Sequence, residues 1–517
     1  MACSSPGIVR SVLSAPTCRA MRGRLSAGSE TMGMMVYERA KLYVGGKWVE
    51  PIEHGRIDVV NPGTEEVIGF APRATQSDVD RAVAAAREAF DHGPWPRTSP
   101  TERADALGRM ADYLAAHARP LAELGIDEAG VPLTFSYARE LGASVVFRFF
   151  EKLTREFTWR EVRHGAAAPA LVVREPAGVV AAIVPFNGPL LSSSAKIAPA
   201  IASGCCIVFK PAPETPLDAF VVAEAAAAAG IPPGVVNVLP GDATVGAALV
   251  GHPGVDRVVF TGSTAGGRAV AAACSPSMKR MTLELGGKAA AMFLDDAPIE
   301  ASLAATLPMS MFNSGQACIA LSRILVPRSR MDEVVDAAIA AVDRMTLGDP
   351  RDPSTVLGPV ISRHHRDRIE GMIDRARAEG TVVARGGTRP AAFGRGWYVE
   401  PTIFRDVDPG AYIAQNEVFG PVLAIIPHDG DDDAVRIANS TPFGLSGAVF
   451  TPDVSRALGI ASRVRVGTFG INGYALDFGL PFGGVKQSGV GREFGVEGLA
   501  EYTEVKAIAL PAGTDLS

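Results

Sequence analysis

Short apolar runs alternate with helical patterns between residues 179 and 285, and no other feature constrains the fold as strongly. The runs predict strands at 179–184, 205–209, 235–239, 257–260 and 281–285. Strands that alternate with helices at this spacing indicate an α/β fold with a doubly wound parallel sheet. Ligands of such sheets bind beyond the carboxyl ends of the strands. The loops 185–189, 210–214 and 261–267 are therefore expected to share one crevice.

Weaker patterns on either side of this region predict further elements. Gly45 and Gly46 separate two short runs and predict a β-hairpin over 42–49. Ser77, with an aspartate three residues later, resembles the capping box that begins a helix, and Thr215 is expected to cap another that ends before Gly230. Other helices are predicted at 101–117 and 334–345, and other strands at 57–60, 289–294 and 423–426.

Charge and cysteine usage exclude several classes of protein. Fifty Lys and Arg residues stand against 56 Asp and Glu, and the net charge of −6 does not suggest a nucleic-acid-binding surface. Six cysteines without a CxxC pair argue against a disulfide framework or a metal site and fit a reducing, cytoplasmic compartment. No apolar run reaches the roughly 18 residues of a transmembrane helix. We therefore expect neither a metal, a nucleic acid nor a membrane as a partner.

The first 36 residues differ from the rest in composition. They hold four arginines, one acid and six serines, and they lack the apolar stretch of a secretory signal. This composition is similar to that of transit peptides. We expect residues 1–40 to be a disordered leader, or to follow a start codon placed upstream of the true start.

Cys318 stands among small and polar residues at 313–318. A substrate can approach a thiol in such surroundings, and the thiolate is a nucleophile whose pKa should be lowered by helix amides or a cation. The alternative is a buried structural cysteine, which Cys205 and Cys206 exemplify within an apolar strand.

Two polar residues at predicted strand ends could act on the same substrate. Glu284 lies between leucines and before two glycines, so a desolvated carboxylate with a raised pKa could act there as a general base. The alternatives are a surface glutamate or an ion pair with Lys288. The side-chain amide of Asn187 could donate to an oxyanion, or the residue could simply occupy a turn.

Two other strand ends could bind a cofactor. The turn at 260–267 follows a strand and begins a helix, which is the arrangement that binds phosphate at a helix N-terminus. It does not have the GxGxxG spacing, so an ordinary tight turn is the alternative. Lys210 and Glu214 could bind ribose hydroxyls or a phosphate, or form a charged surface loop.

The order and spacing of these motifs resemble the aldehyde dehydrogenase family, from about residue 41 to residue 510. The matching motifs are PFN at 185–187, KP at 210–211, FTGST at 260–264, ELGGK at 284–288, GQAC at 315–318, EPT at 400–402, EVFGP at 417–421 and PFGGVKQSG at 481–489. The resemblance implies oxidation of an aldehyde to a carboxylic acid with NAD as cofactor and NADP as the alternative. It also implies roles for individual residues.

By this resemblance, Cys318 attacks the aldehyde carbon and forms a thiohemiacetal. The amide of Asn187 and the backbone N–H of Cys318 hold the oxyanion, which can be worth about 2.7–4 kcal/mol per donor in other enzymes. Glu284 activates the water that hydrolyses the thioester. Lys196 matches a lysine that the family keeps near the active site.

The resemblance also implies a cofactor site. Lys210 and Glu417 would hold the riboses, Phe419 would pack near the nicotinamide ribose, and Ser263 would meet the pyrophosphate. The other expected contacts are Val184, Pro185, Phe186, Pro213, Glu214, Gly241, Phe260, Thr261, Gly262, Thr264, Gly266, Gly267, Leu285 and Gly286. Two positions depart from the family. Phe186 replaces the usual Trp, and Pro213 stands where many NAD-dependent members place an acid, with Glu214 one residue later.

Small residues at the expected substrate tunnel predict a wide passage. Gly188, Ser192 and Ala195 stand where several relatives with small substrates carry bulkier residues. We therefore expect a bulky apolar aldehyde, such as a terpenoid, aromatic or medium-chain one. The other residues expected at the tunnel are Leu191, Ala317, Ile319, Leu476, Phe478 and Phe482.

Two other functions are weighed against this prediction. A CoA-acylating aldehyde dehydrogenase would transfer the acyl group to CoA, but that subclass can dispense with the base that Glu284 supplies. A catalytically silent structural protein on the same fold would be expected to lose the nucleophile or the base, whereas Cys318, Glu284 and Asn187 are all present.

The resemblance implies three structural parts. A Rossmann-type cofactor domain is expected at 41–152 and 178–285, and an α/β catalytic domain at 286–483. A small β oligomerisation element is expected at 153–177 and 484–517, with strands at 171–175 and 502–510. Exposed strand edges of this kind pair with another subunit in the family, so a homodimer or homotetramer is expected.

Overall fold

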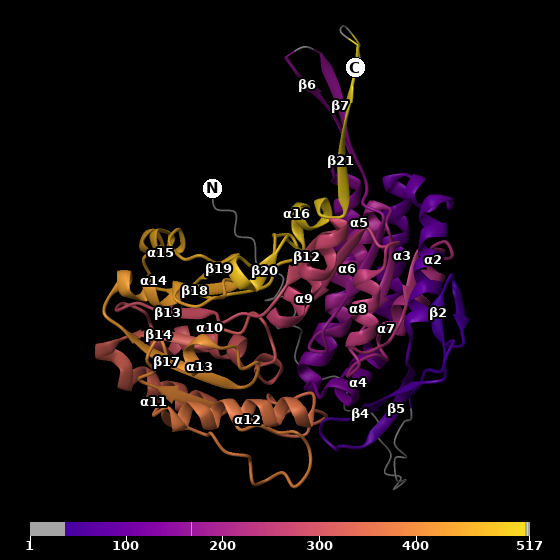
Figure 1. Ribbon diagram of the computed structural model, residues 1–517. Coiled ribbons are helices and arrows are strands. Elements are labelled where there is room, and N and C mark those ends of the chain that lie inside the picture. Colours follow the sequence, from indigo (N-terminus) through magenta and orange to yellow (C-terminus); the bar gives the residue numbers. More distant parts are fainter. Residues whose placement is uncertain (1–36, 167, 512–513, 515–517) are drawn as a thin grey trace, which may run out of the picture.

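A computed structural model of the protein describes residues 37–166, 168–511 and 514, which form two α/β regions and a projecting arm (Figure 1). The predicted leader, residues 1–40, lies outside the described residues up to residue 36. Beyond that point the prediction is wrong, because β1 (Tyr37–Glu38) pairs with β5 (Val67–Pro72) and Tyr37 donates a hydrogen bond to Asp127. β4 (Arg56–Val60) completes this three-stranded sheet.

The first α/β region is built on an eight-stranded sheet. In order across the sheet, its strands are β20 (Gly489–Val490), β12 (Arg280–Glu284), β11 (Arg257–Thr261), β8 (Val179–Ile183), β9 (Cys206–Lys210), β10 (Val236–Val238), β2 (Leu42–Val44) and β3 (Lys47–Val49). The five strands from β12 to β10 are parallel, as predicted. The edge strands β20, β2 and β3 pair in the antiparallel direction.

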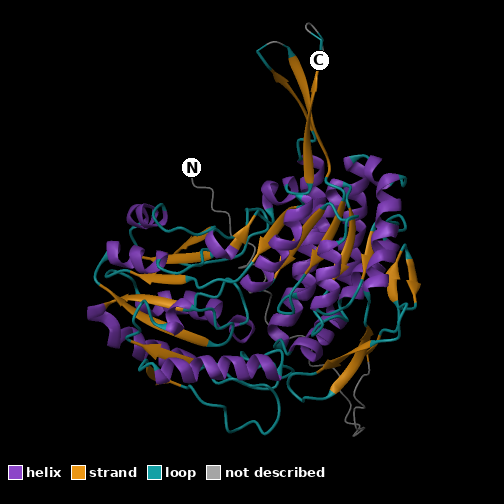
Figure 2. Ribbon diagram, in the orientation of Figure 1, coloured by secondary structure: helices purple, strands orange, loops and turns teal. Residues whose placement is uncertain are grey.

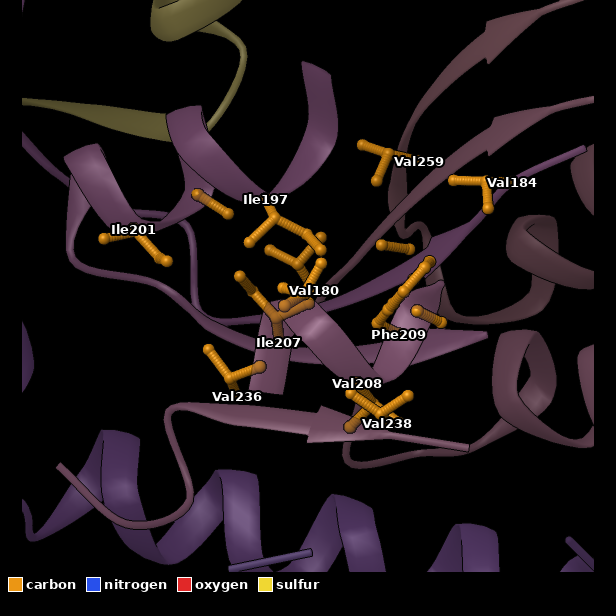
Figure 3. Packing of buried hydrophobic residues seen from close by; sticks show 14 of the residues in the cluster. Val180, Val184, Ile197, Ile201, Ile207, Val208, Phe209, Val236, Val238 and Val259 are labelled. Carbon is orange, nitrogen blue, oxygen red and sulfur yellow. The ribbon is translucent and has the colours of Figure 1, made fainter. Parts of the chain in front are cut away.

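Every residue of β8 and β9 is buried, because helices pack against the central strands (Figure 2). Ile197 and Ile201, in one of these helices, lie over Val180 and Ile207 of the sheet (Figure 3). Burying an aliphatic side chain of this size stabilises a fold by about 1.5–3 kcal/mol, so the β-branched runs of the sequence become the core of the sheet.

The helices of this region are α2 (Gln76–Asp91), α3 (Pro100–Ala116), α4 (Ala118–Ala129), α5 (Leu133–Glu156), α6 (Pro189–Ser203), α7 (Ala219–Ala228), α8 (Ala243–Gly251) and α9 (Thr264–Cys274), with short 3-10 turns at Trp95–Arg97 and Ser275–Ser277. Two predicted helix starts are wrong. Thr75, not Ser77, forms the capping box of α2, because Asp78 reaches back to the backbone of Thr75. α7 begins after Asp218 rather than at Thr215.

The second α/β region holds a seven-stranded sheet. Its strands, in order, are β15 (Val382–Arg385), β16 (Thr402–Arg405), β17 (Val422–His428), β14 (Arg323–Pro327), β13 (Ala290–Phe293), β18 (Ser446–Phe450) and β19 (Thr468–Ile471). Its helices are α10 (Ile299–Met311), α11 (Met331–Val342), α12 (Arg363–Ala378), α13 (Tyr412–Gln415), α14 (Asp431–Asn439) and α15 (Val454–Ala461), with 3-10 turns at Phe312–Gly315, Arg328–Arg330 and Lys486–Ser488. All strand pairs except β15–β16 are parallel.

The arm is a three-stranded antiparallel sheet of β6 (Arg160–His164), β7 (Pro169–Pro176) and β21 (Thr503–Ala509), which projects from the body of the molecule (Figures 1 and 2). β6 was not predicted. α5 continues to Glu156, past the boundary predicted at residue 152, because its buried residues pack along α3 and α6. The sequence prediction assigned β20 and α16 (Gly495–Ala500) to the arm. In the structure, β20 pairs with β12 in the eight-stranded sheet, and α16 contacts α6.

Within the described ranges, none of the helices combines the length and the apolar character that a membrane span requires.

Candidate active site

Four neighbouring strands end at one edge of the eight-stranded sheet. Ile183 of β8 pairs with Lys210 of β9, and Thr261 of β11 pairs with Glu284 of β12. Because β12, β11, β8 and β9 are adjacent and parallel, the loops that follow them lie side by side. The loops that the sequence predicted to share one crevice therefore lie side by side at this edge, and the second α/β region brings Cys318 next to them.

Cys318 follows a tight turn after α10. The turn packs closely against the chain around it, since a Cβ atom on Gly315 would lie 2.1 Å from the carbonyl oxygen of Gly420. The backbone of Cys318 lies against the loop after β12, where a Cβ atom on Gly287 would be 2.3 Å from the Cys318 carbonyl oxygen. The thiol is partly buried. Glycines at these two positions therefore allow the nucleophile turn to contact both walls of the crevice.

Asn187 reaches across the crevice to this turn. It follows β8, and its Nδ2 donates a hydrogen bond to the carbonyl oxygen of Gln316 at 3.0 Å. Gln316 is two residues before Cys318, so the side-chain amide of Asn187 lies beside the nucleophile turn. This placement is what an oxyanion donor requires.

Glu284 ends β12, and its carboxylate is buried without a partner. Among the described residues, no hydrogen-bond partner is found for either carboxylate oxygen. Burial, and next the charge of Glu493, raise the pKa of Glu284 well above its ordinary value. A Cβ atom on Gly483 would lie 2.5 Å from Glu284 Oε1, so the PFGG segment encloses the carboxyl group. The surface glutamate considered as an alternative is excluded by this burial.

Lys196 is fully buried in α6 and is held by two groups. Its Nζ donates to Thr261 Oγ1 at 2.6 Å and forms an ion pair with Glu493. Glu493 also influences Glu284 electrostatically, so Lys196 and the two carboxylates form one charged group beside the crevice. Glu493 was missed from the sequence, where nothing marks a residue of the C-terminal segment as a partner of α6.

The thiol of Cys318 does not have the lowered pKa that was expected. Burial, and next the charges of Glu417 and Glu284, raise the pKa of Cys318 to about 12. The prediction assumed helix amides or a cation beside the sulfur, but the groups that surround it are carboxylates. In the cofactor-free protein the nucleophile is therefore a protonated thiol at neutral pH.

The residues predicted to hold the cofactor lie in the loops around the same crevice, and their donor set fits a dinucleotide. α9 presents its N-terminus to the crevice, capped by Ser263, whose Oγ accepts from Gly266 N at 3.1 Å. A Cβ atom on Gly262 or Gly266 would lie 2.5 or 2.9 Å from the ring of Phe260, so a side chain at either position would displace that ring. Helix amides suit a pyrophosphate, and a lysine with a carboxylate suits ribose hydroxyls. Lys210, which donates to the carbonyl oxygens of Pro211 and Gly241 at 2.8 Å, supplies the cation.

Glu417 lies on the opposite wall of this crevice. Its Oε1 accepts a hydrogen bond from Gly287 N at 2.9 Å, and a Cβ atom on Gly286 would lie 2.1 Å from Oε2. Burial raises the pKa of Glu417 to about 7, against the opposing effect of the Gly287 hydrogen bond and of Arg368. The ring of Phe419 lies 5.9 Å from the ring of Phe186. Other predicted contacts lie in the four strand-end loops or next to them: Val184, Pro185, Pro213, Glu214, Thr264, Gly267 and Leu285.

Residues 48–508 match the aldehyde dehydrogenase family. The chain belongs to the aldehyde dehydrogenase family. The family and the fold predicted from the sequence are confirmed. The chain is 45% identical over 479 residues to geranial dehydrogenase of Castellaniella defragrans, covering 92% of this chain and all of the relative.

Solved structures of aldehyde dehydrogenases have the same fold. The Mycobacterium tuberculosis enzyme in complex with NAD+ is 44% identical, with a TM-score of 0.92 over 93% of this chain and 100% of that one. A mutant of aldehyde dehydrogenase C from Pseudomonas syringae, in complex with NAD+ and octanal, is 38% identical, with a TM-score of 0.89 over 95% of this chain and 100% of that one.

In this aldehyde dehydrogenase, the predicted tunnel residues lie on α6 and on the loops that face it. Gly188, Leu191 and Ser192 are partly buried at the start of α6, and Ala195 is buried one turn later. Leu476, Phe478 and Ile319 are half-buried and pack against the same core cluster as Leu191. Ala317 and Phe482 are buried.

The sequence did not identify α5 as a neighbour of the predicted tunnel residues of α6. A Cβ atom on Gly142 of α5 would lie 3.6 Å from Leu191 Cδ1, so α5 faces α6 at a position without a side chain. His365 was also missed. Its Nε2 bonds the carbonyl oxygen of Phe419 at 2.7 Å, while its ring lies 5.8 Å from that of Phe186. A glycine or histidine within a helix gives no signal of such contacts in the sequence.

The raised pKa of Cys318 predicts slow alkylation of the cofactor-free enzyme. Iodoacetamide reacts with the thiolate, whose fraction grows about tenfold per pH unit below the pKa. With the pKa at about 12, the rate at Cys318 should rise without a plateau from pH 7 to pH 10. The measurement is peptide-resolved mass spectrometry, with Cys318→Ser as the control. A plateau that begins near pH 8 would show a thiol with a lowered pKa and would contradict this prediction.

Proposed function

We propose that this aldehyde dehydrogenase oxidises a bulky apolar aldehyde to its carboxylic acid, with NAD as the cofactor and Cys318 as the nucleophile. One observation carries the proposal. The Asn187 amide is bonded to the turn that bears Cys318, while Glu284 is buried in the same crevice with both oxygens unpaired among the described residues. A nucleophile, an oxyanion donor and a base are thus brought together from three segments distant in sequence.

In the first step, the sulfur of Cys318 forms a bond to the aldehyde carbon and the carbonyl π electrons move to oxygen. The thiol proton passes to a water molecule before or during attack, because only the thiolate is nucleophilic. The Nδ2 of Asn187 and the backbone N–H of Cys318 donate to the resulting oxyanion. Thiohemiacetal formation makes loss of the aldehyde hydrogen with its electron pair favourable, since the oxyanion drives collapse to a thioester.

The bound cofactor would supply the acceptor for that hydrogen and its two electrons. The α9 N-terminus with Ser263 would hold its pyrophosphate, and Lys210 and Glu417 would hold the riboses. Phe419 would pack beside the nicotinamide ribose. The cofactor of the solved Mycobacterium tuberculosis relative, NAD+, supports NAD in this chain.

In the last step, Glu284 removes a proton from a water molecule as the water oxygen attacks the thioester carbon. The C–S bond breaks, Cys318 leaves as a thiolate and the acid departs. A carboxylate with a raised pKa is a stronger base than an exposed one, so the burial of Glu284 suits this role. The positive charge of Lys196 would partly offset the free-energy cost of burying the two carboxylates beside it.

Three observations support a bulky apolar substrate. Gly142 of α5 and Gly188, which precedes α6, carry no side chain, and Ser192 and Ala195 of α6 are small. The similar protein from Castellaniella defragrans is named for geranial, a branched terpenoid aldehyde. The solved Pseudomonas syringae relative is a complex with octanal.

Narrowing the tunnel should change the substrate preference. Gly188 has φ −157° and ψ 58°, so its φ lies outside the left-handed region, and a Cβ atom there would make only an ordinary 3.5 Å contact with Ser192 Oγ. Gly188→Phe should therefore fold, and we expect kcat/KM for citral to fall by at least about tenfold. The value for propanal should change by less than about threefold. Ser192→Ala, which adds no volume, is the control, and an equal loss for both aldehydes would contradict a tunnel role.

A spectrophotometric panel tests the proposed function as a whole. Short, branched, aromatic and terpenoid aldehydes are each combined with NAD or NADP, with and without CoA. We expect CoA-independent formation of reduced NAD that is greatest with long or branched aldehydes. Activity only with CoA would favour the acylating subclass, and a steady preference for acetaldehyde would contradict the substrate proposal.

Assembly and location remain part of the proposal. We expect a homodimer or homotetramer, since Val162, Val505 and Ile508 of the arm are apolar and exposed. Residues 37–156 and 178–285, with β20 and α16, would form the cofactor domain, residues 286–483 the catalytic domain, and β6, β7 and β21 the arm. Cytoplasmic location fits the cysteines at 205, 206, 274 and 318, which are all free thiols.

A further inference from the structure

Three consecutive residues before Cys318 adopt the left-handed backbone conformation. Their φ angles are +50° at Asn313, +55° at Ser314 and +74° at Gly315. Gly315 needs this conformation and the absence of a side chain, because it packs against the carbonyl of Gly420. Asparagine adopts it more readily than most residues, whereas serine is rarely found there. Such a run persists only where surrounding contacts hold it.

Hydrogen bonds from the side chains of this turn hold it in place. Ser314 Oγ donates to the carbonyl oxygen of Gly358 at 2.7 Å. Gln316 Nε2 donates to the carbonyl oxygen of Asn313 at 3.0 Å, and Gln316 Oε1 accepts from Ile361 N at 3.0 Å. Ser314 and Gln316 are both buried, so each of these bonds is shielded from water.

Asn313 makes a different connection, to the opposite wall of the crevice. Its Nδ2 donates to the backbone carbonyl oxygen of Asn187 at 3.0 Å. In return, the Nδ2 of Asn187 donates to the carbonyl oxygen of Gln316, also at 3.0 Å. Two hydrogen bonds in opposite directions therefore join Asn187 to the turn that bears the nucleophile.

We propose that Asn313 is a positioning residue for the oxyanion hole: its amide fixes the backbone of Asn187, so that the Asn187 side chain is held beside Cys318. This inference rests on the proposed role of Asn187 as oxyanion donor. The left-handed backbone at Asn313 directs its side chain toward the β8–α6 loop, which explains why the unusual conformation is retained.

The reciprocal arrangement leaves one hydrogen of the Asn187 amide for the substrate. An amide nitrogen carries two hydrogens, and the carbonyl of Gln316 accepts one of them. The second can donate to an oxyanion that forms next to Cys318. Without Asn313, the loop that carries Asn187 loses its backbone contact with the turn, and a misplacement of about 1 Å can slow a reaction 10²-fold.

The test compares glycine substitutions at two neighbouring left-handed positions. Asn313→Gly and Ser314→Gly each relieve the strain of a left-handed backbone conformation, and each removes one side-chain hydrogen bond. Only the hydrogen bond of Asn313 reaches Asn187. We expect the single-turnover rate of reduced-cofactor formation to fall about 10- to 100-fold in Asn313→Gly. It should fall less than about threefold in Ser314→Gly. NAD affinity, measured by calorimetry, should stay within about twofold in both variants.

A double-mutant cycle with Asn187→Ala distinguishes positioning from a general structural effect. Asn187→Ala alone should slow the same step by about 10²–10³-fold, as loss of an oxyanion donor does in other enzymes. If Asn313 acts through Asn187, adding Asn313→Gly to Asn187→Ala should cost less than about threefold. Asn313→Asp, which keeps the shape and loses the donor, replaces Asn313→Gly in the cycle if the glycine variant does not fold.

The possible results separate two kinds of failure. In one, Asn187→Ala slows the reaction as expected while Asn313→Gly slows the double variant by its full separate factor. That result would overturn the positioning role and leave the proposed function intact. An equal loss in Ser314→Gly would also overturn it, because the whole turn would then be responsible. If Asn187→Ala has no effect, the oxyanion role itself fails, and with it the inference.

Discussion

Replacing Cys318 by alanine is expected to abolish aldehyde oxidation, by about 10⁴-fold or more in kcat. Without the sulfur, no thiohemiacetal forms, and the aldehyde carbon would have to lose its hydrogen as a poorly stabilised acylium ion. Removal of the nucleophile in other enzymes of covalent mechanism has effects at least this large. The measurement is reduced-NAD formation at 340 nm with the best aldehyde of the panel.

Two comparisons make this result specific to the thiol at position 318. Cys205→Ser is a matched control, because Cys205 is also buried. Its sulfur accepts a hydrogen bond from Ser203 Oγ and donates one to the carbonyl oxygen of Tyr502, and a hydroxyl can make both bonds. It should retain activity within about threefold. Cys318→Ala should still bind NAD, since no proposed cofactor contact involves the sulfur. Activity within tenfold of wild type in Cys318→Ala would contradict covalent catalysis.

The fold was predictable where burial determines the sequence. Strands such as β8 and β9 are buried along their whole length and therefore read as continuous runs of apolar residues, so their bounds were predicted within a residue or two. Helix starts were less predictable, because capping depends on which of several polar residues adopts the right geometry. Thr75 forms the cap with Asp78, although Ser77 with Asp80 has the same spacing.

The site was predictable as a set of residues but not as a network. Cys318, Glu284 and Asn187 could be singled out because a polar residue at a strand end or among small residues is unusual. The contacts that orient them come from Asn313, Glu493 and other positions whose roles depend on three-dimensional proximity. The pKa of Cys318 was predicted in the wrong direction for the same reason, since its burial and, next, the charges near it come from distant segments.

Replacing Glu284 by glutamine should separate the two halves of the reaction. Glutamine has the same shape but cannot accept a proton from water, so the thioester should form and then persist. We expect a burst of about one reduced cofactor per active site at the wild-type rate, followed by turnover slowed about 10²–10⁴-fold. Stopped-flow absorbance measures both phases. The NAD affinity should be unchanged, because Glu284 is not among the groups proposed to hold the cofactor.

The pH dependence of thioester hydrolysis, the second phase, tests whether Glu284 acts as a base. Because burial raises the pKa of Glu284, the wild-type hydrolysis rate should increase with pH as the carboxyl group loses its proton. In Glu284→Gln this increase should disappear, and hydroxylamine, which attacks thioesters without a base, should restore turnover. Loss of the burst itself would instead place Glu284 in the first half of the reaction. Unchanged steady-state turnover would exclude it as the base that activates water.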